Sequence, residues 1–440
     1  YYSRMEKGKK QKKEEIEEEE EVEEVEEVEE EEDRMGEDFA KDPRAFPLIV
    51  DAGRIADAAL DYAIELVKPN ASIYEICVNT DNFVRQELAK VYTKKKYTKG
   101  LAFPTCVSVN EVCGLYSPTA EDLDVNHKTL VQGDVVKVDL GVHIHGFATV
   151  VAHTVVCGED KVSGRKADVI LAAYNALHAS LRLMNVGKNT NDDVTNIVKK
   201  VTDSYKTQPL EAVLSHNMKK DIIDSFETIL LKKTNDQKVD IRKFEHGNLF
   251  GLDVIVSTGE GKTKEADLKV TVYKRALETT YKLKTESARK LLSVVEHNFF
   301  NFPFSLNAFD NEQNLKTTKQ IDNLKNVQKM GLSECVNHDL FYPNPVMVEK
   351  KGEIVAHFKY TIAVRNEGPL VVCGKLLDTS KFSSECTIED EEVKALLAKN
   401  LDDYVPNSKK TVKVEKKKDN KEKKAKKREA KAKKAEEEGK

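Results

Sequence analysis

Three histidines that lie close together in the sequence are candidates for metal chemistry. His143 and His145 are separated by one residue, and His153 follows eight positions later in a stretch rich in β-branched residues. Alternate side chains of a strand point to the same face, so His143 and His145 would share one face. A zinc site needs further ligands at suitable spacing, and none is evident in the sequence. We therefore expect these histidines to have a structural or surface role.

Two other short motifs each lack a residue that their chemistry requires. The run Gly-Glu-Gly-Lys-Thr at 259–263 resembles the end of a phosphate-binding loop, but Val256 stands where the first glycine belongs. We predict a turn between strands at this point. Cys113 lies near Ser108, but no histidine is spaced to activate it as a nucleophile. This pattern favours a buried free thiol.

Hydrophobic periodicity predicts a compact domain that alternates between helices and strands. Ser72 and Glu75 have the spacing of a capping box, which predicts a helix start, and His145-Gly146 predicts a hairpin turn. Helices are expected at 46–67, 72–92, 166–184 and 192–205, and strands at 103–109, 135–144, 147–157, 210–214, 228–231, 252–257, 355–364 and 370–373. This order fits an α+β fold in which helices cover a mixed or antiparallel sheet.

Charge divides the 440-residue chain into segments. The predicted organisation is a Lys-rich then Glu-rich leader at 1–42, a core at 43–279 and 341–401, a helical basic insert at 280–340, and a Lys-rich tail at 402–440. Residues 14–33 include 16 acidic side chains, interrupted only by Ile16, Val22, Val25 and Val28. Self-repulsion and the shortage of apolar area predict that the leader and the tail are disordered. The net charge of −5 is an average over these opposed segments and says little about partners.

Cysteine usage and hydropathy favour a reducing compartment. The seven cysteines are scattered without a Cys-x-x-Cys pair, which is typical of free thiols. No run of about 18 apolar residues is present, and the charged N-terminus lacks the apolar centre of a signal peptide. We expect a reducing compartment such as the cytoplasm, with no insertion into a membrane.

Several strings occur in the order found in the methionine aminopeptidase, or pita-bread, fold. They are VKVDLGVHIHGFATVVAHT from Val136, LSHNMKKDIID from Leu214, GLDVIVSTGEGK from Gly251 and AHFKYT from Ala356. With AFPTCVSVNEVCGLYSP from Ala102, the insert and the Lys-rich tail, the chain resembles the proliferation-associated, ErbB-receptor-binding protein family over about 46–400. That resemblance implies a type II aminopeptidase fold with a helical insert and without the enzyme's activity.

The resemblance also implies where metal ligands would lie. Active relatives bind two divalent cations through two Asp, one His and two Glu, because carboxylates bridge the ions and activate a water. The matching positions here are Asp139, Val150, His216, Asp253 and Lys359. Val150 has no donor atom, and Lys359 places a positive charge where a bridging carboxylate belongs. We expect no metal and no other cofactor, and we expect Lys359 to pair with Asp139 or Asp253 instead.

Both acid/base positions of the active relatives are changed as well. The resemblance places Leu115 and Asp224 where those enzymes have catalytic histidines. Loss of the ligands together with the proton-transfer groups predicts an inactive homologue with no catalytic residues. A residual or altered metal-dependent aminopeptidase is the alternative.

Dense basic clusters favour binding to a polyanion. The candidate RNA contacts are Lys94, Lys95, Lys96, Lys99, Lys274, Arg275, Lys282, Lys284, Arg289 and Lys290. Further clusters are Lys219 with Lys220, Lys232 with Lys233, and Lys316, Lys319, Lys325 and Lys329. No pattern of paired stacking aromatics indicates base-specific readout, so structured RNA read through its backbone is expected.

The resemblance points to the same partner. It implies contact with rRNA and the large ribosomal subunit near the nascent-chain exit, and passage through the nucleus and nucleolus. A monomer is expected, with the Glu-rich leader competing with RNA for the basic surface. The alternative is a regulatory interaction module that binds a receptor tail or a transcription co-regulator.

Overall fold

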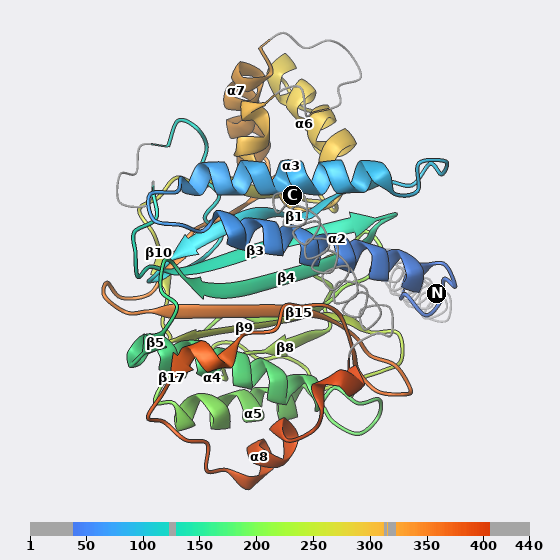
Figure 1. The fold of residues 1–440 in the computed structure, drawn as a ribbon. Coiled ribbons are helices and arrows are strands. Elements are labelled where there is room, and N and C mark those ends of the chain that lie inside the picture. The colour runs from blue at the N-terminus through green and yellow to red at the C-terminus, as the bar shows by residue number, and fades with distance from the viewer. Residues whose placement is uncertain (1–37, 123–128, 312–314, 316–322, 405–440) are drawn as a thin grey trace, which may run out of the picture.

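A nine-stranded antiparallel sheet forms the centre of the protein (Figure 1). The computed structural model describes residues 38–122, 129–311, 315 and 323–404. The strands run in the order β1-β3-β4-β15-β9-β7-β8, with β16 beside β15 and β6 beside β9. Their bounds are β1 (Lys99–Val109), β3 (Val135–Ile144), β4 (Phe147–Val156), β6 (Gln208–Pro209), β7 (Leu214–Asn217), β8 (Thr228–Leu230), β9 (Leu249–Ser257), β15 (Val355–Ala363) and β16 (Leu370–Cys373).

Two pairs of helices cover the two halves of this sheet. In the first half, α2 (Ala45–Leu66) and α3 (Ile73–Lys90) pack on β1, β3 and β4. In the second, α4 (Arg165–Leu181) and α5 (Asn191–Ser204) pack together, and α4 lies on β9 and β15. The short helix α8 (Glu391–Leu397) lies against α4 and α5. None of the helices in these described ranges is long and apolar enough to cross a membrane.

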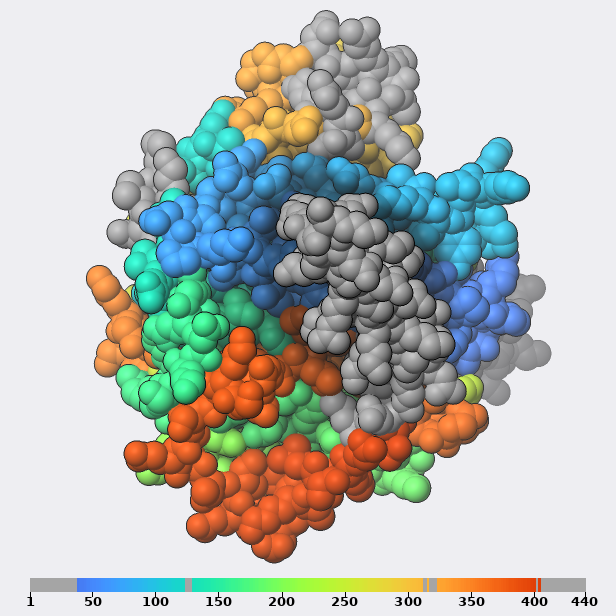
Figure 2. Space-filling model, viewed as in Figure 1, coloured from blue at the N-terminus to red at the C-terminus, as the bar shows by residue number. Residues whose placement is uncertain are grey.

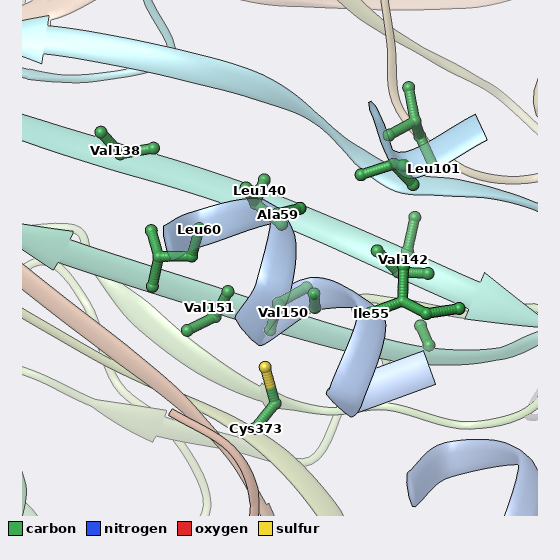
Figure 3. Packing of buried hydrophobic residues seen from close by; sticks show 14 of the residues in the cluster. Ile55, Ala59, Leu60, Leu101, Val138, Leu140, Val142, Val150, Val151 and Cys373 are labelled. Carbon is green, nitrogen blue, oxygen red and sulfur yellow. The ribbon is translucent and has the colours of Figure 1, made fainter. Parts of the chain in front are cut away.

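Strand alternation separates the hydrophobic core from the opposite face of the sheet. Figure 3 shows Leu140 of β3 and Val151 of β4 beside Ala59 of α2, and all three are fully buried. Asp139 and Val150 immediately precede Leu140 and Val151 in their strands. Because neighbouring residues of a strand point to opposite faces, Asp139 and Val150 belong to the face away from α2.

The two halves of the sheet meet along a narrow seam between β4 and β15. Lys359 and Ala152 are the single aligned pair in this strand contact. On one side of that pair, the Thr361 hydroxyl accepts from the backbone N–H of Val150 and donates to its carbonyl, both at 2.8 Å. On the other side, the Thr154 hydroxyl makes the equivalent two bonds to a backbone unit of β15, at 2.7 and 2.8 Å. Side-chain hydroxyls therefore replace backbone ladder bonds on both sides of Lys359.

The insert is a small α+β lobe that projects beyond α3 (Figure 1). It comprises β11 (Val272–Arg275), α6 (Glu286–Phe299), β12 (Phe304–Ser305), η2 (Leu306–Asp310), α7 (Leu324–Asn337) and β13 (Phe341–Asn344). The strands form a sheet in the order β12-β11-β13, and the lobe has its own hydrophobic core. Helices α6 and α7 approach closely at Gly331, where a Cβ would lie 2.7 Å from the Ser287 carbonyl oxygen. The segment 280–340, predicted as a helical insert, contains α6 and α7, and the short elements β12 and η2 lie between these two helices.

Most predicted core elements are present, with one informative error. The predicted strand at 210–214 is wrong: a turn with Ala212 at φ 60° precedes β7, which starts at Leu214 and contains His216. The hairpin turn is confirmed, because His145 and Gly146 have φ values of 56° and 83°, as a type I′ turn requires. Sequence patterns did not predict the short elements β2 (Val112–Gly114), β5 (Val162–Ser163), β10 (Lys264–Glu265), β14 (Met347–Val348), η4 (Thr379–Lys381), β17 (Phe382–Ser383) and η5 (Leu401–Tyr404).

Local predictions about turns and caps are confirmed in part. Residues 259–263 form a loop that ends at the start of β10, and Gly261 has φ 73°. Cys113 is buried, and burial raises the pKa of its thiol to about 12. Ser72 accepts a bond from the Glu75 backbone N–H at 3.4 Å, which is one half of the predicted capping box. Residues 38–42 of the predicted leader are described, and Phe39 is buried there. The rest of the leader and the tail beyond Tyr404, for which disorder is predicted, and the basic residues Lys316 and Lys319 lie outside the described residues.

Candidate functional site

A row of aligned residues crosses the seam on the face opposite α2. Asp139 of β3 pairs in register with Ala152 of β4, Ala152 pairs with Lys359 of β15, and Lys359 pairs with Asp253 of β9. Residues aligned across a sheet project from the same face, so four neighbouring strands place these side chains side by side. Positions far apart in the sequence thus meet because of strand register.

Lys359 bridges the two carboxylates of this row. Its Nζ lies 2.8 Å from Oδ2 of Asp139 and 2.9 Å from Oδ2 of Asp253. The predicted ion pair is therefore present, and it includes both aspartates. His357 adds a further contact, with Nε2 at 2.7 Å from Oδ1 of Asp253. The Lys359 ammonium also lies 5.5 Å from the centre of the Phe103 ring.

The protonation states of this cluster follow from burial opposed by charge. Burial alone would lower the pKa of Lys359, but the charges of Asp139 and Asp253 outweigh it and hold that pKa above its usual range. Burial alone would raise the pKa of Asp253, but the charges of Lys359 and His357 hold it well below its usual range. Lys359 is therefore a cation and Asp253 an anion at neutral pH.

These residues do not fit a pair of divalent metal ions. Val150 presents an isopropyl group on the same face, and its backbone is occupied by the Thr361 hydroxyl. A cation already lies at ion-pair distance from both aspartates, so a metal would have to overcome its repulsion. Within the described ranges, no group of three or more His, Cys, Asp or Glu side chains is arranged to hold a metal.

A cavity of about 160 Å³ lies over this row. Val150, His216, Asp224, Asp253 and Lys359 all contribute to its lining. The Nδ1 atom of His216 lies 3.1 Å from the backbone oxygen of a residue in the loop between β7 and β8. The structure therefore brings together most of the positions that the resemblance implied.

The two positions at which the resemblance implied acid/base histidines differ in their location relative to the cavity. Asp224 lines the cavity but forms an ion pair with Lys274 of the insert, with the closest atoms at 2.5 Å. Leu115 follows β2 with φ 67° and does not line the cavity. Asp224 is thus tied to a cation, and Leu115 has no ionisable group.

The three candidate histidines lie in different surroundings. His143 is fully buried and stacks on Phe302 at 4.3 Å, and burial lowers the pKa of His143 to about 3. His153 is also buried, and burial lowers its pKa to about 3. His145 belongs to the hairpin turn and stacks on Tyr97 at 4.5 Å. His143 and His145 therefore do not share a strand face, because the turn begins at His145.

Half of the residues predicted to contact RNA are engaged within the protein. These residues and their partners are Lys99 (carbonyls of Leu88 and Val91), Lys274 (Asp224), Arg275 (Glu296), Arg289 (carbonyls of Leu283 and Lys284) and Lys290 (Glu286). A phosphate would have to compete with these contacts. By contrast, Lys94, Lys96, Lys282 and Lys284 are exposed, and Lys95 is exposed as well but donates to the Tyr97 hydroxyl at 3.4 Å.

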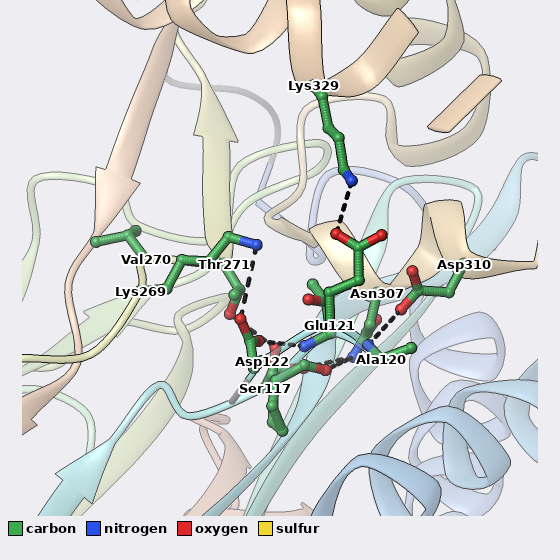
Figure 4. Close-up of polar contacts among 12 residues, drawn as sticks. Ser117, Ala120, Glu121, Asp122, Lys269, Val270, Thr271, Asn307, Asp310 and Lys329 are labelled. Carbon is green, nitrogen blue, oxygen red and sulfur yellow. Dashed lines mark hydrogen bonds and ion pairs between the residues drawn. The ribbon is translucent and has the colours of Figure 1, made fainter. Parts of the chain in front are cut away.

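Lysines at the base of the insert are also neutralised. Lys325 and Lys329 both pair with Glu121, at 3.1 and 2.6 Å, and Lys325 pairs with Asp310 at 2.6 Å. Figure 4 shows Lys329 and Lys269 reaching the carboxylates of a single loop that follows β2. These lysines fasten the insert to the core. Similar pairs join Lys219 to Glu227, Lys232 to Glu211, and Lys233 to Asp192.

Comparison with known proteins places this scaffold in a class. The sequence profile of metallopeptidase family M24 matches residues 47–264. The curved DNA-binding protein of Schizosaccharomyces pombe is 38% identical over 83% of this chain and 92% of its own length. ERBB-3 binding protein 1 of Arabidopsis thaliana is 38% identical over 79% of this chain and 84% of its own length. The protein is therefore an M24-type chain with the pita-bread fold.

A solved structure narrows the relationship further. A thermophilic Arx1 aligns with a TM-score of 0.74 at 29% sequence identity, covering 82% of this chain and 99% of that chain. Taken with the curated relatives, this similarity shows that the chain belongs to the proliferation-associated, ErbB-receptor-binding protein family.

Sequence reasoning did not connect three residues with this site, and it assigned one of them, Lys274, to RNA binding. His357 and Thr361 flank Lys359 at two-residue spacing on β15, and alternation along the strand was the signal that could have found them. Lys274 comes from the insert, more than a hundred residues from Asp139 in the sequence. No local pattern links it to Asp224, because tertiary folding brings the two together.

Proposed function

We propose that this protein is a non-enzymatic RNA- and ribosome-binding protein built on an inactive methionine aminopeptidase scaffold. It would associate with the large ribosomal subunit near the nascent-chain exit and act in ribosome biogenesis or translation regulation. Its locations would be the cytoplasm and the nucleus, including the nucleolus. The observation that carries the proposal is the position of Lys359, whose ammonium bridges Asp139 and Asp253.

The charge at that position opposes the chemistry of a two-metal peptidase. Such a site needs bridging carboxylates to hold two cations and lower the pKa of a bound water. Here the bridging position carries a cation, and Asp224 is paired with Lys274. Metal analysis and hydrolysis assays with Met-initiated peptides test the proposal that the protein has no aminopeptidase activity. Stoichiometric cobalt, manganese or zinc together with turnover would establish the alternative, a residual aminopeptidase.

Two observations support a nucleic-acid partner. Lys94 and Lys96 are exposed and have no carboxylate partner within the described part of the chain, so their charges are available to phosphates. A relative that covers most of the chain is named a curved DNA-binding protein. Backbone contacts of this kind suit structured RNA, whose shape rather than base sequence is read by most double-strand-binding proteins.

Co-sedimentation with large ribosomal subunits tests the proposal directly. We expect the full chain to sediment with subunits at about 50 mM salt and to be released at about 200 mM, because each phosphate contact displaces counterions. The Lys94→Ala/Lys96→Ala variant should require less salt for release. A matched variant, Lys350→Ala/Lys351→Ala, removes two exposed lysines elsewhere and should behave as wild type. Protein that stays free at both salt concentrations would contradict the proposal.

A protein-interaction module is the second candidate, favoured by the relative named for binding ERBB-3. Phe226 follows Asp224 at the cavity by two residues, and its side chain is 77% exposed. A receptor tail or transcription co-regulator bound there would remain attached after nuclease treatment. Partners bridged by RNA would be lost from the same pull-down, and that difference separates the two candidates.

A further inference from the structure

An aromatic and basic surface lies at the end of α3. The loop after this helix has the sequence Tyr-Thr-Lys-Lys-Lys-Tyr from Tyr92 to Tyr97. The rings of Tyr92 and Tyr97 are 5.5 Å apart, and Tyr97 stacks on His145 of the β3–β4 turn at 4.5 Å. The Lys95 ammonium lies 5.4 Å from the centre of the Tyr97 ring. We call Tyr92, Lys94, Lys95, Lys96, Tyr97 and His145 the α3-loop surface.

The ring stack fixes the loop while leaving its charges outside. The Tyr92 hydroxyl donates to Oδ2 of Asp51 on α2 at 2.7 Å, which anchors the loop to the first half of the sheet. Lys94 and Lys96 are exposed, and no ion pair joins either to a carboxylate in the described ranges. This arrangement differs from the base of the insert, where carboxylates neutralise the lysines.

The described part of the chain begins beside this surface. Asp38 lies 3.8 Å from the ammonium of Lys219. Asp221, two residues after Lys219, donates its backbone N–H to the carbonyl of Gly146 at 2.8 Å. Gly146 follows His145, which belongs to the α3-loop surface. Figures 1 and 2 show the start of the described chain and the loop after α3 at the same end of the molecule.

The acidic segment 14–33 is therefore tethered close to unneutralised lysines. Only residues 34–37 separate it from Asp38, and four residues span at most about 14 Å. A short tether gives the segment an effective concentration of order millimolar at nearby surfaces. Segment 14–33 carries 16 acidic side chains, so charge complementarity with the loop is strong.

We propose that the acidic segment 14–33 docks on the α3-loop surface of its own chain and competes with external polyanions for it. Rival internal partners are the basic run at 7–13 and the lysines at 409–440, but the latter follow Tyr404, which lies in the other half of the molecule. Docking regulates the RNA-binding surface of the proposed function, yet it requires no RNA to occur. The leader then acts as a built-in competitor whose strength falls with salt.

Zero-length carbodiimide cross-linking of the full chain, read by mass spectrometry, tests the docking itself. We expect amide links from glutamates of 14–33 to Lys94, Lys95 or Lys96, with several-fold lower yield at high salt. Lys350 and Lys351 are the internal controls, because they are exposed lysines at the turn before β15. Links confined to tail lysines, links spread equally over the control lysines, or no links would each overturn the proposal.

A deletion cycle with a labelled RNA hairpin tests the competition. Deleting 14–33 should tighten binding by roughly threefold or more at low salt and steepen the salt dependence. In the Lys94→Ala/Lys96→Ala background, the same deletion should have a much smaller effect, because two of the three lysines of the shared surface are gone. An equal gain in both backgrounds would overturn the proposal. Absence of RNA binding in every variant, with cross-links intact, would contradict the proposed function and leave the docking supported.

Discussion

Lysine has opposite roles in the row of residues that crosses the seam and in the loop after α3. At the seam, Lys359 forms ion pairs with Asp139 and Asp253, so its charge is neutralised within the fold. In the loop, Lys94 and Lys96 extend from a stack of aromatic rings, and no carboxylate within the described residues opposes them. The difference shows that the number of lysines in a sequence does not measure binding capacity; available charge depends on which lysines the fold has already paired.

The largest effect on stability should come from breaking the ion pairs of Lys359 with Asp139 and Asp253. Lys359→Met would leave the buried Asp139 without a counter-charge and Asp253 with His357 alone, and loss of one partner of a buried ion pair typically destabilises a protein by about 3–5 kcal/mol. Urea denaturation at neutral pH measures the loss. The exposed Lys350→Met variant should stay within about 0.5 kcal/mol of wild type. A small loss for Lys359→Met would mean that the cluster does not hold the sheet together.

Rebuilding the ligand set should make stability depend on metal. Val150→Asp combined with Lys359→Glu supplies four carboxylates and His216 at the five positions, and their mutual repulsion would favour a divalent cation. Manganese at 100 times its dissociation constant would stabilise the fold by about 2.7 kcal/mol, seen as a rise in Tm. The single Val150→Asp variant keeps the Lys359 cation and should show no such rise. Equal Tm values with and without manganese in the double variant would argue against the inferred ligand geometry.

The pH dependence of the cluster should distinguish it from ordinary surface pairs. The pKa of Asp253 is lowered, so its contribution to stability is complete above the unfolded value of about 3.9 and is lost as pH falls through the lower folded value. The pKa of Lys359 is raised, so its contribution is complete below about 10.4 and is lost only as pH rises further. The contribution of Asp253 and Lys359 to the free energy of unfolding of the wild type should therefore be nearly constant between about pH 5 and 9.

The same reasoning predicts how the Lys359→Met variant responds to acid. Without Lys359, the burial that raises the pKa of Asp253 is opposed less strongly, so protonation of Asp253 in acid reduces the cost of burying its charge. The stability gap between wild type and variant should narrow by about 1 kcal/mol or more between pH 7 and pH 4.5. Paired urea titrations at these pH values measure it. A gap that widens in acid would show that the aspartates are not the groups responsible.

The smallest expected effect is on the salt dependence of RNA binding, and it is tested by comparing two pairs of surface lysines. Lys94→Ala/Lys96→Ala should lower the slope of log affinity against log salt by about 2 for duplex RNA, because each lysine that neutralises a phosphate contributes close to one unit to that slope. Lys325→Ala/Lys329→Ala removes the same charge from lysines paired with Glu121, and the slope should stay nearly unchanged. Fluorescence anisotropy with one RNA hairpin measures both. Equal slopes for the two variants would erase the distinction between paired and available lysines.

Regular elements could be predicted where periodicity is strong. The long amphipathic helices and the hairpin of β3 and β4 follow directly from spacing and from the His145-Gly146 turn. The strand around His216 was placed too early, because a turn with Ala212 at positive φ has no sequence signal of the glycine or asparagine kind. The β-sheet of the insert was missed because its strands are two to four residues long and pair with distant segments.

The cleft residues could be named from the sequence only through the family resemblance. Their contact depends on the register in which Ala152 faces Asp139 on one side and Lys359 on the other, and register is a property of the assembled sheet. The fate of the basic clusters could not be predicted at all. Pairs such as Lys274 with Asp224 join residues 50 positions apart, and they decide which charges remain available.

The seam between β4 and β15 has a consequence for how the two halves of the molecule are coupled. The α3-loop surface belongs to the half that carries β1, β3 and β4, whereas Tyr404, from which the Lys-rich tail departs, lies 5.4 Å from Arg182 at the end of α4 in the other half. One aligned backbone pair, two threonine hydroxyls and the Lys359 bridge join these halves at the seam. The Lys359 bridge therefore couples the half that carries the α3-loop surface to the half in which the described chain ends, together with contacts of α2 with the segment after β16.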